Sequence, residues 1–105
     1  MSTQPALITS RDNPFIKALR RLAQDSVAYR KKGQAWLEGD HLCRAALQRG
    51  LQPATAVFSE SFWAHPSVDW SSVAIKNIVI SDRLFAEVSG LESPAPMGFL
   101  IDLPL

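Results

Sequence analysis

Apolar residues in the first third of the chain repeat at the spacing of an α-helix. An apolar residue recurs every three or four positions, at Phe15, Ile16, Leu19, Leu22 and Ala23. This stripe predicts a helix with one face turned toward a core. Asn13 is a favourable N-cap, and Pro14 suits the first helical position, where its missing N–H is not needed. The sequence therefore predicts a helix that begins at Pro14.

Further along the chain, short apolar runs between turn residues predict strands. They are expected at residues 34–37, 54–59, 77–81 and 97–103. A second helical stripe follows the first of these strands; Asp40 is its expected cap, and Gly50 is a favourable αL residue after its end. Residues 60–64 suffice for one helical turn, and Ser81 or Asp82 is the expected cap of a last helix.

The order of these elements predicts an α/β fold. A strand, a helix and a strand follow one another between residues 34 and 59, which favours a βαβ unit with parallel pairing. Leu100 and Ile101 favour a central place for the last strand. Residues 1–9 are expected to be a flexible lead-in, although Leu7 and Ile8 are able to dock onto the body. The remainder, residues 10–105, is long enough for one domain with its own core.

Charge is unevenly distributed, although the net charge is only +1. Residues 1–50 carry nine Lys and Arg against four Asp and Glu, a net charge of +5, whereas residues 51–105 carry two against six, a net charge of −4. This asymmetry favours a face that binds a polyanion. On the predicted first helix, Lys17, Arg20 and Arg21 lie opposite the apolar stripe. A helix end is expected at residues 29–33, with three consecutive cations at residues 30–32. Such a basic side is either a solvated helix face or a surface that contacts phosphates.

Few residue patterns support catalysis or metal binding. Cys43 is the only cysteine, which excludes intrachain disulfides and Cys-based zinc sites, and its apolar neighbours favour a core position. His41 and His65 lack metal-ligand spacing. GxSxG, GxGxxG and P-loop motifs are missing, so hydrolase and nucleotide-binding functions have no support. Trp63 and Trp70 either stack on bases or, as is commoner, cover a sheet edge.

The turn at Gly39 joins a predicted strand to a predicted helix. Turns of this kind lie at a sheet edge where the helix N-terminus offers free N–H donors and a partial positive charge. Glu38 and His41 flank the glycine. Either they form an acid/base pair across the turn or, as we favour, Glu38 accepts N–H bonds from its own loop and holds the turn rigid.

Two blocks of the sequence resemble the SpoU/TrmH family of RNA ribose 2′-O-methyltransferases. Residues 8–17 read ITSRDNPFIK and continue with Leu19 and Leu22, similar to the family's opening I-x-S-x-x-N-P-x-I-K-x-L-x-x-L. Residues 37–50 read LEGDHLCRAALQRG, similar to x-E-G-x-H-L-x-x-E-A-L-x-x-G, with Ala45 in place of the usual acid. A less specific likeness covers residues 80–89 and the family's P-x-G segment, where Met97 replaces a frequent glutamine.

The resemblance implies the N-terminal substrate-binding domain of such an enzyme. It implies a three-layer α/β/α sandwich with a small mixed sheet, like the ribosomal proteins that bind kink-turn RNA. The family's knotted SPOUT domain, which binds S-adenosylmethionine and carries the catalytic residues, is absent from this chain. We therefore expect no catalytic residue, metal or cofactor here, and a parent protein that forms a homodimer through the missing domain. The sequence shows neither a signal peptide nor an apolar run long enough for a membrane span, so we expect no membrane contact and a cytoplasmic location.

The predicted function is recognition of structured rRNA or tRNA on behalf of a ribose methyltransferase domain. RNA contacts are expected from Arg11, Asn13, Lys17, Arg20, Arg21, Arg30, Lys31, Lys32, Glu38, Gly39 and His41. The cations of residues 1–50, which also include Arg44 and Arg49, are expected to converge beside the Gly39 turn as a single surface. The alternatives are a dimerisation or packing module with little RNA contact, and a free-standing RNA-binding protein.

Overall fold

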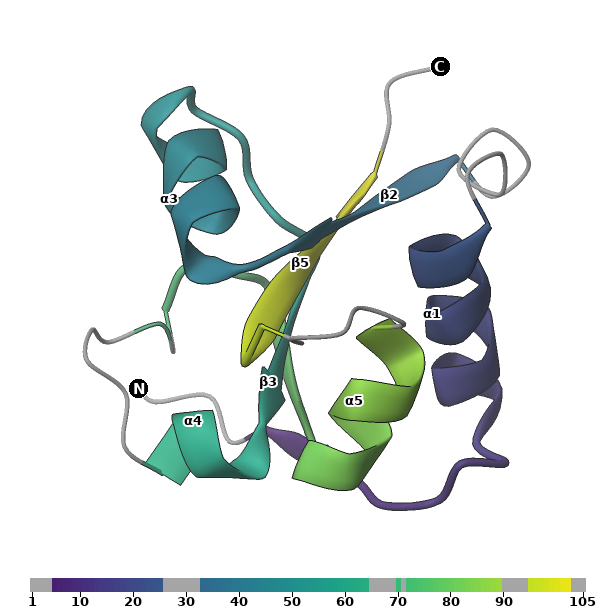
Figure 1. Ribbon diagram of the computed structural model, residues 1–105. Coiled ribbons are helices and arrows are strands. Elements are labelled where there is room, and N and C mark those ends of the chain that lie inside the picture. Colours follow the sequence, from purple (N-terminus) through teal and green to yellow (C-terminus); the bar gives the residue numbers. More distant parts are fainter. Residues whose placement is uncertain (1–4, 26–32, 65–69, 71, 90–94, 103–105) are drawn as a thin grey trace.

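Five strands form one sheet, and helices cover both of its faces (Figure 1). The computed structural model describes residues 5–25, 33–64, 70, 72–89 and 95–102. In chain order its elements are β1 (Ala6–Ile8), α1 (Pro14–Gln24), β2 (Gln34–Glu38), α3 (Asp40–Gln48), β3 (Thr55–Ser59), α4 (Glu60–Ala64), β4 (Lys76–Ile80), α5 (Asp82–Ser89) and β5 (Met97–Asp102). This alternation of strands and helices confirms the predicted α/β class.

The strand order across the sheet is β1-β4-β3-β5-β2. β4 pairs in parallel with β1 and β3, whereas β5 pairs antiparallel with β3 on one side and with β2 on the other. The sheet is therefore mixed, as expected. The predicted parallel pairing of β2 with β3 is wrong, because β5 lies between them. β5 is buried from Met97 to Ile101, which agrees with its predicted central position.

Two separate cores fill the space between the sheet and its helices. α1 and α5 cover one face, where Ile16 and Phe85 pack with Val57. α3 and α4 cover the opposite face, where Cys43 packs with Phe58. Successive residues of a strand point to opposite faces, so β3 supplies both cores. This arrangement confirms the three-layer α/β/α sandwich.

Local sequence signals set two of the helix ends. The side-chain oxygen of Asn13 accepts a hydrogen bond from the N–H of Phe15 at 2.8 Å, and Pro14 is the first residue of α1, as predicted. After α3, Gly50 has a φ of 83°, and its N–H donates to the carbonyl of Leu47 at 3.0 Å. Glycine adopts this left-handed conformation without steric cost, so Gly50 ends the helix as expected.

The N-terminal region differs from the prediction at two points. Residues Ala6–Ile8 form β1, which pairs with β4 at the edge of the sheet. The interpretation of residues 1–9 as a flexible lead-in did not include a strand, because three residues are too few to show an alternating pattern. It did allow Leu7 and Ile8 to dock onto the body, which agrees with β1. α1 ends at Gln24, earlier than the expected helix end at residues 29–33, most of which lies outside the described residues.

Two tryptophans lie against the sheet. The ring of Trp63 is 5.0 Å from that of Phe58, and the ring of Trp70 is 5.8 Å from that of Phe99, centroid to centroid. Trp70 is only 3% exposed, and Trp63 is half-buried. The rings cover the sheet, as preferred over base stacking, but these two ring contacts are with its inner strands β3 and β5 and not with an edge strand. The buried ring of Trp70 has no free face for a base.

Candidate nucleic-acid interface

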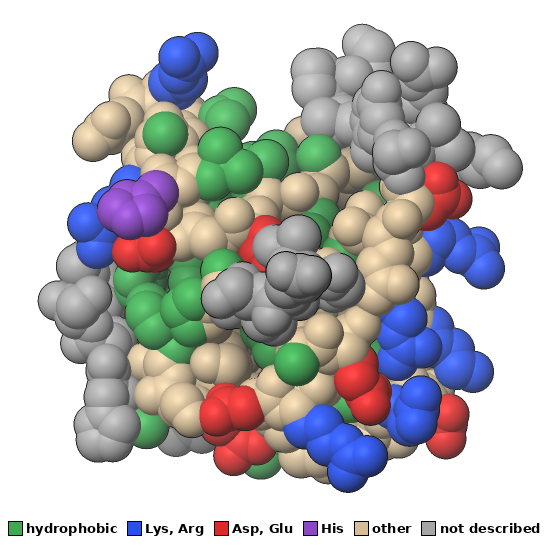
Figure 2. Space-filling model, in the orientation of Figure 1, with side chains coloured by type: hydrophobic (Ala, Val, Ile, Leu, Met, Phe, Trp, Pro, Cys, Tyr) green, Lys and Arg blue, Asp and Glu red, His purple; other side chains and the backbone are tan. Residues whose placement is uncertain are grey.

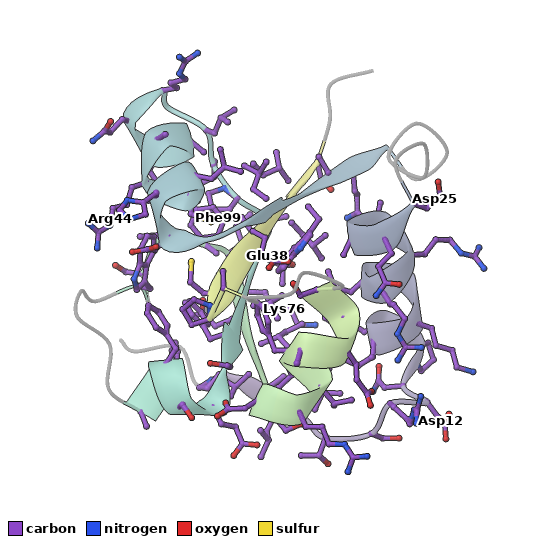
Figure 3. The ribbon with its side chains drawn as sticks, in the orientation of Figure 1. Asp12, Asp25, Glu38, Arg44, Lys76 and Phe99 are labelled. Carbon is purple, nitrogen blue, oxygen red and sulfur yellow. The ribbon has the colours of Figure 1, made fainter. Side chains whose placement is uncertain are left out.

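The carboxylate of Glu38, at the end of β2, joins three segments of the chain (Figure 3). It accepts hydrogen bonds from the indole N–H of Trp36 at 3.1 Å, from the hydroxyl of Ser89 at 2.6 Å and from the backbone N–H of Ala95 at 3.2 Å. Ser89 ends α5, and Ala95 lies just before β5. Glu38 therefore braces the end of β2 against two other segments rather than against its own loop.

Gly39 makes the turn from β2 into α3. Its φ is 107°, a backbone conformation that residues with a side chain rarely adopt, so this turn favours glycine. Its N–H donates to the carbonyl of Met97 at 2.8 Å, and its carbonyl accepts the N–H of Cys43 at 3.0 Å. Gly39 is thus the N-cap of α3, and the prediction of Asp40 as the cap is wrong, because Asp40 is already the first helical residue.

His41 lies on the opposite side of the sheet from the Glu38 carboxylate. Glu38 bonds to Ser89 in the α5 layer, whereas His41 is an exposed residue of α3. Next to it on the same helix, Asp40 pairs with Arg44 at 3.8 Å. The fold therefore does not bring Glu38 and His41 together, which removes the geometric basis for an acid/base pair.

The polar side of α1 carries a surface of three cations, which we name the α1 cation surface: Lys17, Arg20 and Arg21. Lys17 and Arg21 are exposed, whereas Ile16 and Leu19 point into the core, as the apolar stripe predicted. With Gln24 and Asp25, the three cations line an open hollow of about 500 Å³. Lys and Arg side chains are prominent on this side of the molecule (Figure 2).

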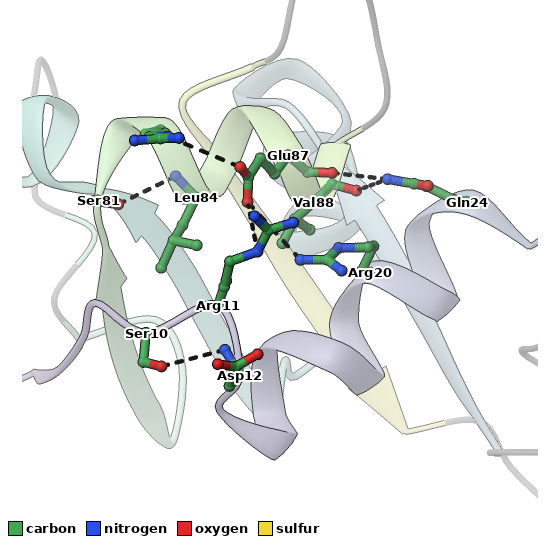
Figure 4. A network of polar contacts seen from close by, with 10 residues as sticks. Ser10, Arg11, Asp12, Arg20, Gln24, Ser81, Leu84, Glu87 and Val88 are labelled. Atoms are coloured by element: carbon green, nitrogen blue, oxygen red, sulfur yellow. Dashed lines mark hydrogen bonds and ion pairs between the residues drawn. The ribbon is translucent and has the colours of Figure 1, made fainter.

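Three arginines surround the carboxylate of Glu87, a group we name the arginine cluster: Arg11, Arg20, Arg83 and Glu87 (Figure 4). The nitrogen-to-oxygen distances are 4.0 Å from Arg11, 3.9 Å from Arg20 and 3.9 Å from Arg83. Beside them, the amide of Gln24 donates to the carbonyls of Glu87 and Val88 at 2.8 and 3.1 Å. These contacts connect α1 to α5.

The described cations of residues 1–50 form two groups rather than one. The α1 cation surface and the arginine cluster lie on the side of α1 and α5, whereas Arg44 belongs to α3 on the opposite face of the sheet. In Figure 3, Arg44 and Asp25, which follows α1, lie on opposite sides of the molecule. For the described residues, the expected single surface beside Gly39 is therefore wrong. Three of the predicted contacts lie outside the described residues: Arg30, Lys31 and Lys32.

Sequence reasoning missed two members of the arginine cluster. Arg83 and Glu87 are four residues apart on α5, a spacing that places their side chains on one helix face. That spacing was a readable signal for the pair. No signal in the sequence indicated that Arg11 and Arg20 approach Glu87, because both lie more than sixty residues before it in the chain.

Two titratable groups outside these surfaces have structural roles. Burial raises the pKa of the Cys43 thiol to about 12, so it is a core residue and not a nucleophile, as the sequence favoured. The hydroxyl and backbone N–H of Ser61 hold the pKa of Asp82 below its usual value. Among the described residues, no three His, Cys, Asp or Glu side chains lie where they would share a metal ion, and every helix is too short to cross a bilayer.

The sequence matches a family model described as the MRM3-like substrate binding domain, over residues 13–98. It is also 34% identical over 87 residues to the uncharacterized tRNA/rRNA methyltransferase slr1673 from Synechocystis sp. (strain ATCC 27184 / PCC 6803 / Kazusa). That alignment covers 83% of this chain and 27% of the relative. The chain thus spans about a quarter of the length of this curated relative.

Solved structures share the fold at lower identity. An RNA 2′-O ribose methyltransferase has a TM-score of 0.70 at 24% identity, covering 93% of this chain and 38% of that one. The AdoMet-bound rRNA methyltransferase from Sinorhizobium meliloti has a TM-score of 0.72 at 18% identity, and the match covers 97% of this chain and 38% of that one. The SpoU methyltransferase AviRb from Streptomyces viridochromogenes has a TM-score of 0.70 at 15% identity, and the match covers 89% of this chain and 36% of that one.

The family match covers most of the chain, including the turn at Gly39 and all the described helices. These three solved structures agree with the family match in fold. In each of them, the part that matches this chain is well under half of the solved chain's length. Together these similarities confirm the resemblance drawn from the two sequence blocks. The chain belongs to the MRM3-like substrate-binding domain family.

Proposed function

We propose that this chain is the RNA-recognition module of an S-adenosylmethionine-dependent ribose 2′-O-methyltransferase. The module presents structured rRNA or tRNA to a knotted catalytic domain that lies C-terminal to it in the parent protein. Support comes from the family match and from the names of similar proteins, which describe tRNA/rRNA and RNA 2′-O ribose methyltransferases. In this proposal the chain holds neither catalytic residues nor the cofactor, the parent is a cytoplasmic homodimer through its catalytic domain, and the RNA is the partner.

The observation that carries the proposal is the α1 cation surface. Lys17 and Arg21 face solvent, and the structure pairs neither with an acid among the residues it describes. They border the hollow of about 500 Å³ on α1. Unneutralised cations beside an open hollow favour phosphate binding, because each phosphate that they neutralise releases counterions. The buried stripe of Ile16 and Leu19 holds the helix in place, so the cations are presented on a rigid element.

A second RNA contact is proposed at the C-terminal end of β2, where the chain turns into α3. The exposed His41 stands at the start of α3, directly after the half-buried turn at Gly39. An imidazole and helix N–H groups bind a phosphate or a 2′-hydroxyl, which is how proteins commonly read RNA shape. Glu38 contributes indirectly, by bracing the turn from the other side.

The test is the affinity of the chain for structured RNA, measured by fluorescence anisotropy over a range of salt concentrations. The variant Lys17→Glu/Arg21→Glu should weaken binding at least about tenfold and lower the slope of log K against log salt by about 2, because two phosphate contacts are lost. The matched control Arg49→Glu/Lys76→Glu makes the same charge change at exposed positions away from α1. Equal losses in both variants would mean that net charge, and not the α1 cation surface, drives binding.

One observation favours the alternative of a packing module. Leu7 on the edge strand β1 is 62% exposed, and with Trp63 and Val79 it lines a hollow of about 250 Å³. The variant Leu7→Glu should leave RNA affinity unchanged if the chain is an RNA-recognition module. Under the packing alternative the same variant would abolish association of the chain with itself or with its partner domain, measured by sedimentation, while the α1 variants would have no effect.

A further inference from the structure

The arginine cluster is more positive than a structural ion pair requires. Three guanidinium groups share the single carboxylate of Glu87, which leaves a local charge of +2. One arginine is enough to neutralise that carboxylate and to tie α1 to α5. Arg83 is 88% exposed and Arg11 is 64% exposed, and ion pairs at such exposure add little stability. Stability therefore does not account for two of the three arginines.

The cluster is also open in its geometry. The three nitrogen-to-oxygen distances are 3.9–4.0 Å, whereas a closed guanidinium–carboxylate hydrogen bond measures about 2.8 Å. A terminal nitrogen of Arg20 and one oxygen of Glu87 are buried and have no hydrogen-bond partner. The Arg20 donor and the Glu87 acceptor thus each have unused hydrogen-bonding capacity.

A hollow of about 210 Å³ lies at this cluster. It is lined by Arg11, Arg83 and Glu87, by the hydroxyl-bearing Thr9 and Ser81, and by Leu84. The space suits a phosphate group, and guanidinium forks match phosphate oxygens in two parallel hydrogen bonds. Ser81 caps α5 through the N–H of Leu84, so the hollow also lies at the partially positive end of that helix.

We propose that the arginine cluster binds one phosphate group of the RNA backbone, with Arg11 and Arg83 donating to the same phosphate. This inference rests on the proposed RNA-recognition function and adds a discrete site to it. Arg20 lines the hollow on α1 and also pairs with Glu87, so the α1 cation surface and the cluster are continuous. An RNA strand that follows α1 therefore reaches the cluster. Glu87 acts as a positioning residue, because it holds the three guanidinium groups around the hollow.

The experiment compares the salt dependence of RNA binding among Arg11→Gln, Arg83→Gln and the double variant. Each single variant should weaken binding roughly threefold to tenfold and lower the slope of log K against log salt by about 1, because in this proposal the phosphate is held only when both arginines donate to it. The double variant should also lower the slope by about 1 and not by about 2, because both arginines hold the same phosphate. The control Arg49→Gln, an exposed cation on the far side of the sheet, should keep the wild-type slope.

Each other outcome has a definite meaning. If wild type shows no salt-dependent RNA binding, the proposed function fails and this site fails with it. If wild type binds but Arg83→Gln keeps the full slope, only the site is wrong. A slope loss of about 2 in the double variant would mean two separate phosphate contacts and would overturn the shared site.

A second measurement separates RNA phosphate from free phosphate. Inorganic phosphate, added at constant ionic strength, should compete with RNA for wild type but not for Arg83→Gln. If phosphate raises the thermal midpoint of wild type only, and Arg83→Gln still binds RNA like wild type, the cluster holds a free anion and the RNA assignment is wrong. Glu87→Gln adds positive charge, so by charge alone it would tighten RNA binding. Weaker binding of this variant supports the positioning role, and tighter binding refutes it.

Discussion

The indole ring of Trp36 on β2 packs directly against Gly98 on β5. A Cβ atom on Gly98 would lie 2.3 and 2.5 Å from two ring carbons of Trp36 and 2.7 Å from the carbonyl oxygen of Leu37. The ring also packs near Phe85 of α5, with centroids 6.1 Å apart. Gly98 therefore lets the indole close the core under α5, which gives a physical reason for the glycine in the sequence's Pro-x-Gly segment.

The substitution Gly98→Ala should lower the free energy of unfolding by about 1–3 kcal/mol, because the added methyl group overpacks this contact. Urea unfolding measures the change. In a Trp36→Leu background the same substitution should cost less, since the ring atoms are gone, although the contact with the Leu37 carbonyl remains. An equal cost in both backgrounds would show that the backbone, and not the indole, excludes the side chain.

Removal of the Glu38 carboxylate should destabilise the fold without a loss of RNA affinity. Glu38→Ala leaves the donors on Trp36, Ser89 and Ala95 without their acceptor, at a cost of about 2–3 kcal/mol by urea unfolding. Glu38→Gln should cost less, because its amide oxygen still accepts. If Glu38→Gln keeps the wild-type stability but loses RNA affinity, Glu38 contacts RNA directly and the bracing role is wrong.

Asn13 should contribute to stability as a helix cap. Asn13→Ala removes the hydrogen bond to the Phe15 N–H and should lower the free energy of unfolding by about 1 kcal/mol. Asn13→Asp keeps a capping oxygen and should restore stability, but it adds a negative charge. Loss of RNA affinity in the stable Asn13→Asp variant would support the predicted RNA contact at this position, and unchanged affinity would contradict it.

Stability should fall in acid partly through Asp82. Hydrogen bonds from Ser61 lower the pKa of Asp82 below its usual value near 3.8. Because the native pKa is the lower one, the contribution is present above about pH 4 and is lost as the pH falls through the native pKa. The difference in thermal midpoint between wild type and Asp82→Asn should therefore be constant from pH 5 to 8. It should vanish in stronger acid, where Asp82 is protonated in the folded protein as well.

A control separates this effect from general acid unfolding. Asp12→Asn removes a carboxylate to which no other described residue donates a hydrogen bond. The difference in thermal midpoint between Asp12→Asn and wild type should not show the pH dependence expected for Asp82→Asn. A pH-independent difference for Asp82→Asn across the whole range would refute the role of the Ser61 contacts.

The thiol of Cys43 should be inert while the chain is folded. Burial raises its pKa to about 12, so almost no thiolate exists at pH 8. A chromogenic disulfide reagent should react with it only at the rate at which the protein unfolds, and added urea should accelerate labelling in parallel with unfolding. Fast labelling of the folded protein would mean that α3 opens locally from the sheet.

Local patterns predicted the elements well where the signal was contained in neighbouring residues. The Asn13–Pro14 pair, the apolar stripe of α1 and the αL glycine at Gly50 each act within about one helical turn, so the sequence was enough. The strand order was not predictable in this way. β2 pairs with β5, whose residues lie about sixty positions later, and no local rule decides which of several apolar strands takes that place.

The same division applies to the candidate site. Lys17 and Arg21 were predictable on the polar face of a helix, because helical spacing alone places them opposite the buried stripe. The direction of the Glu38 side chain depended on the α5 residue Ser89, and its separation from His41 depended on which layer each helix occupies. These relationships require packing of distant segments.

By itself, the sequence determined the α/β class, the main helix and strand positions, and the family, because periodicity, capping residues and motif spacing are properties of neighbouring residues. Only the tertiary structure decided that β5 separates β2 from β3, that Gly98 accommodates Trp36, and that arginines from α1 and its preceding loop meet Arg83 around Glu87. Those features arise from contacts between segments far apart in the chain, whose free energies depend on packing and charge in three dimensions.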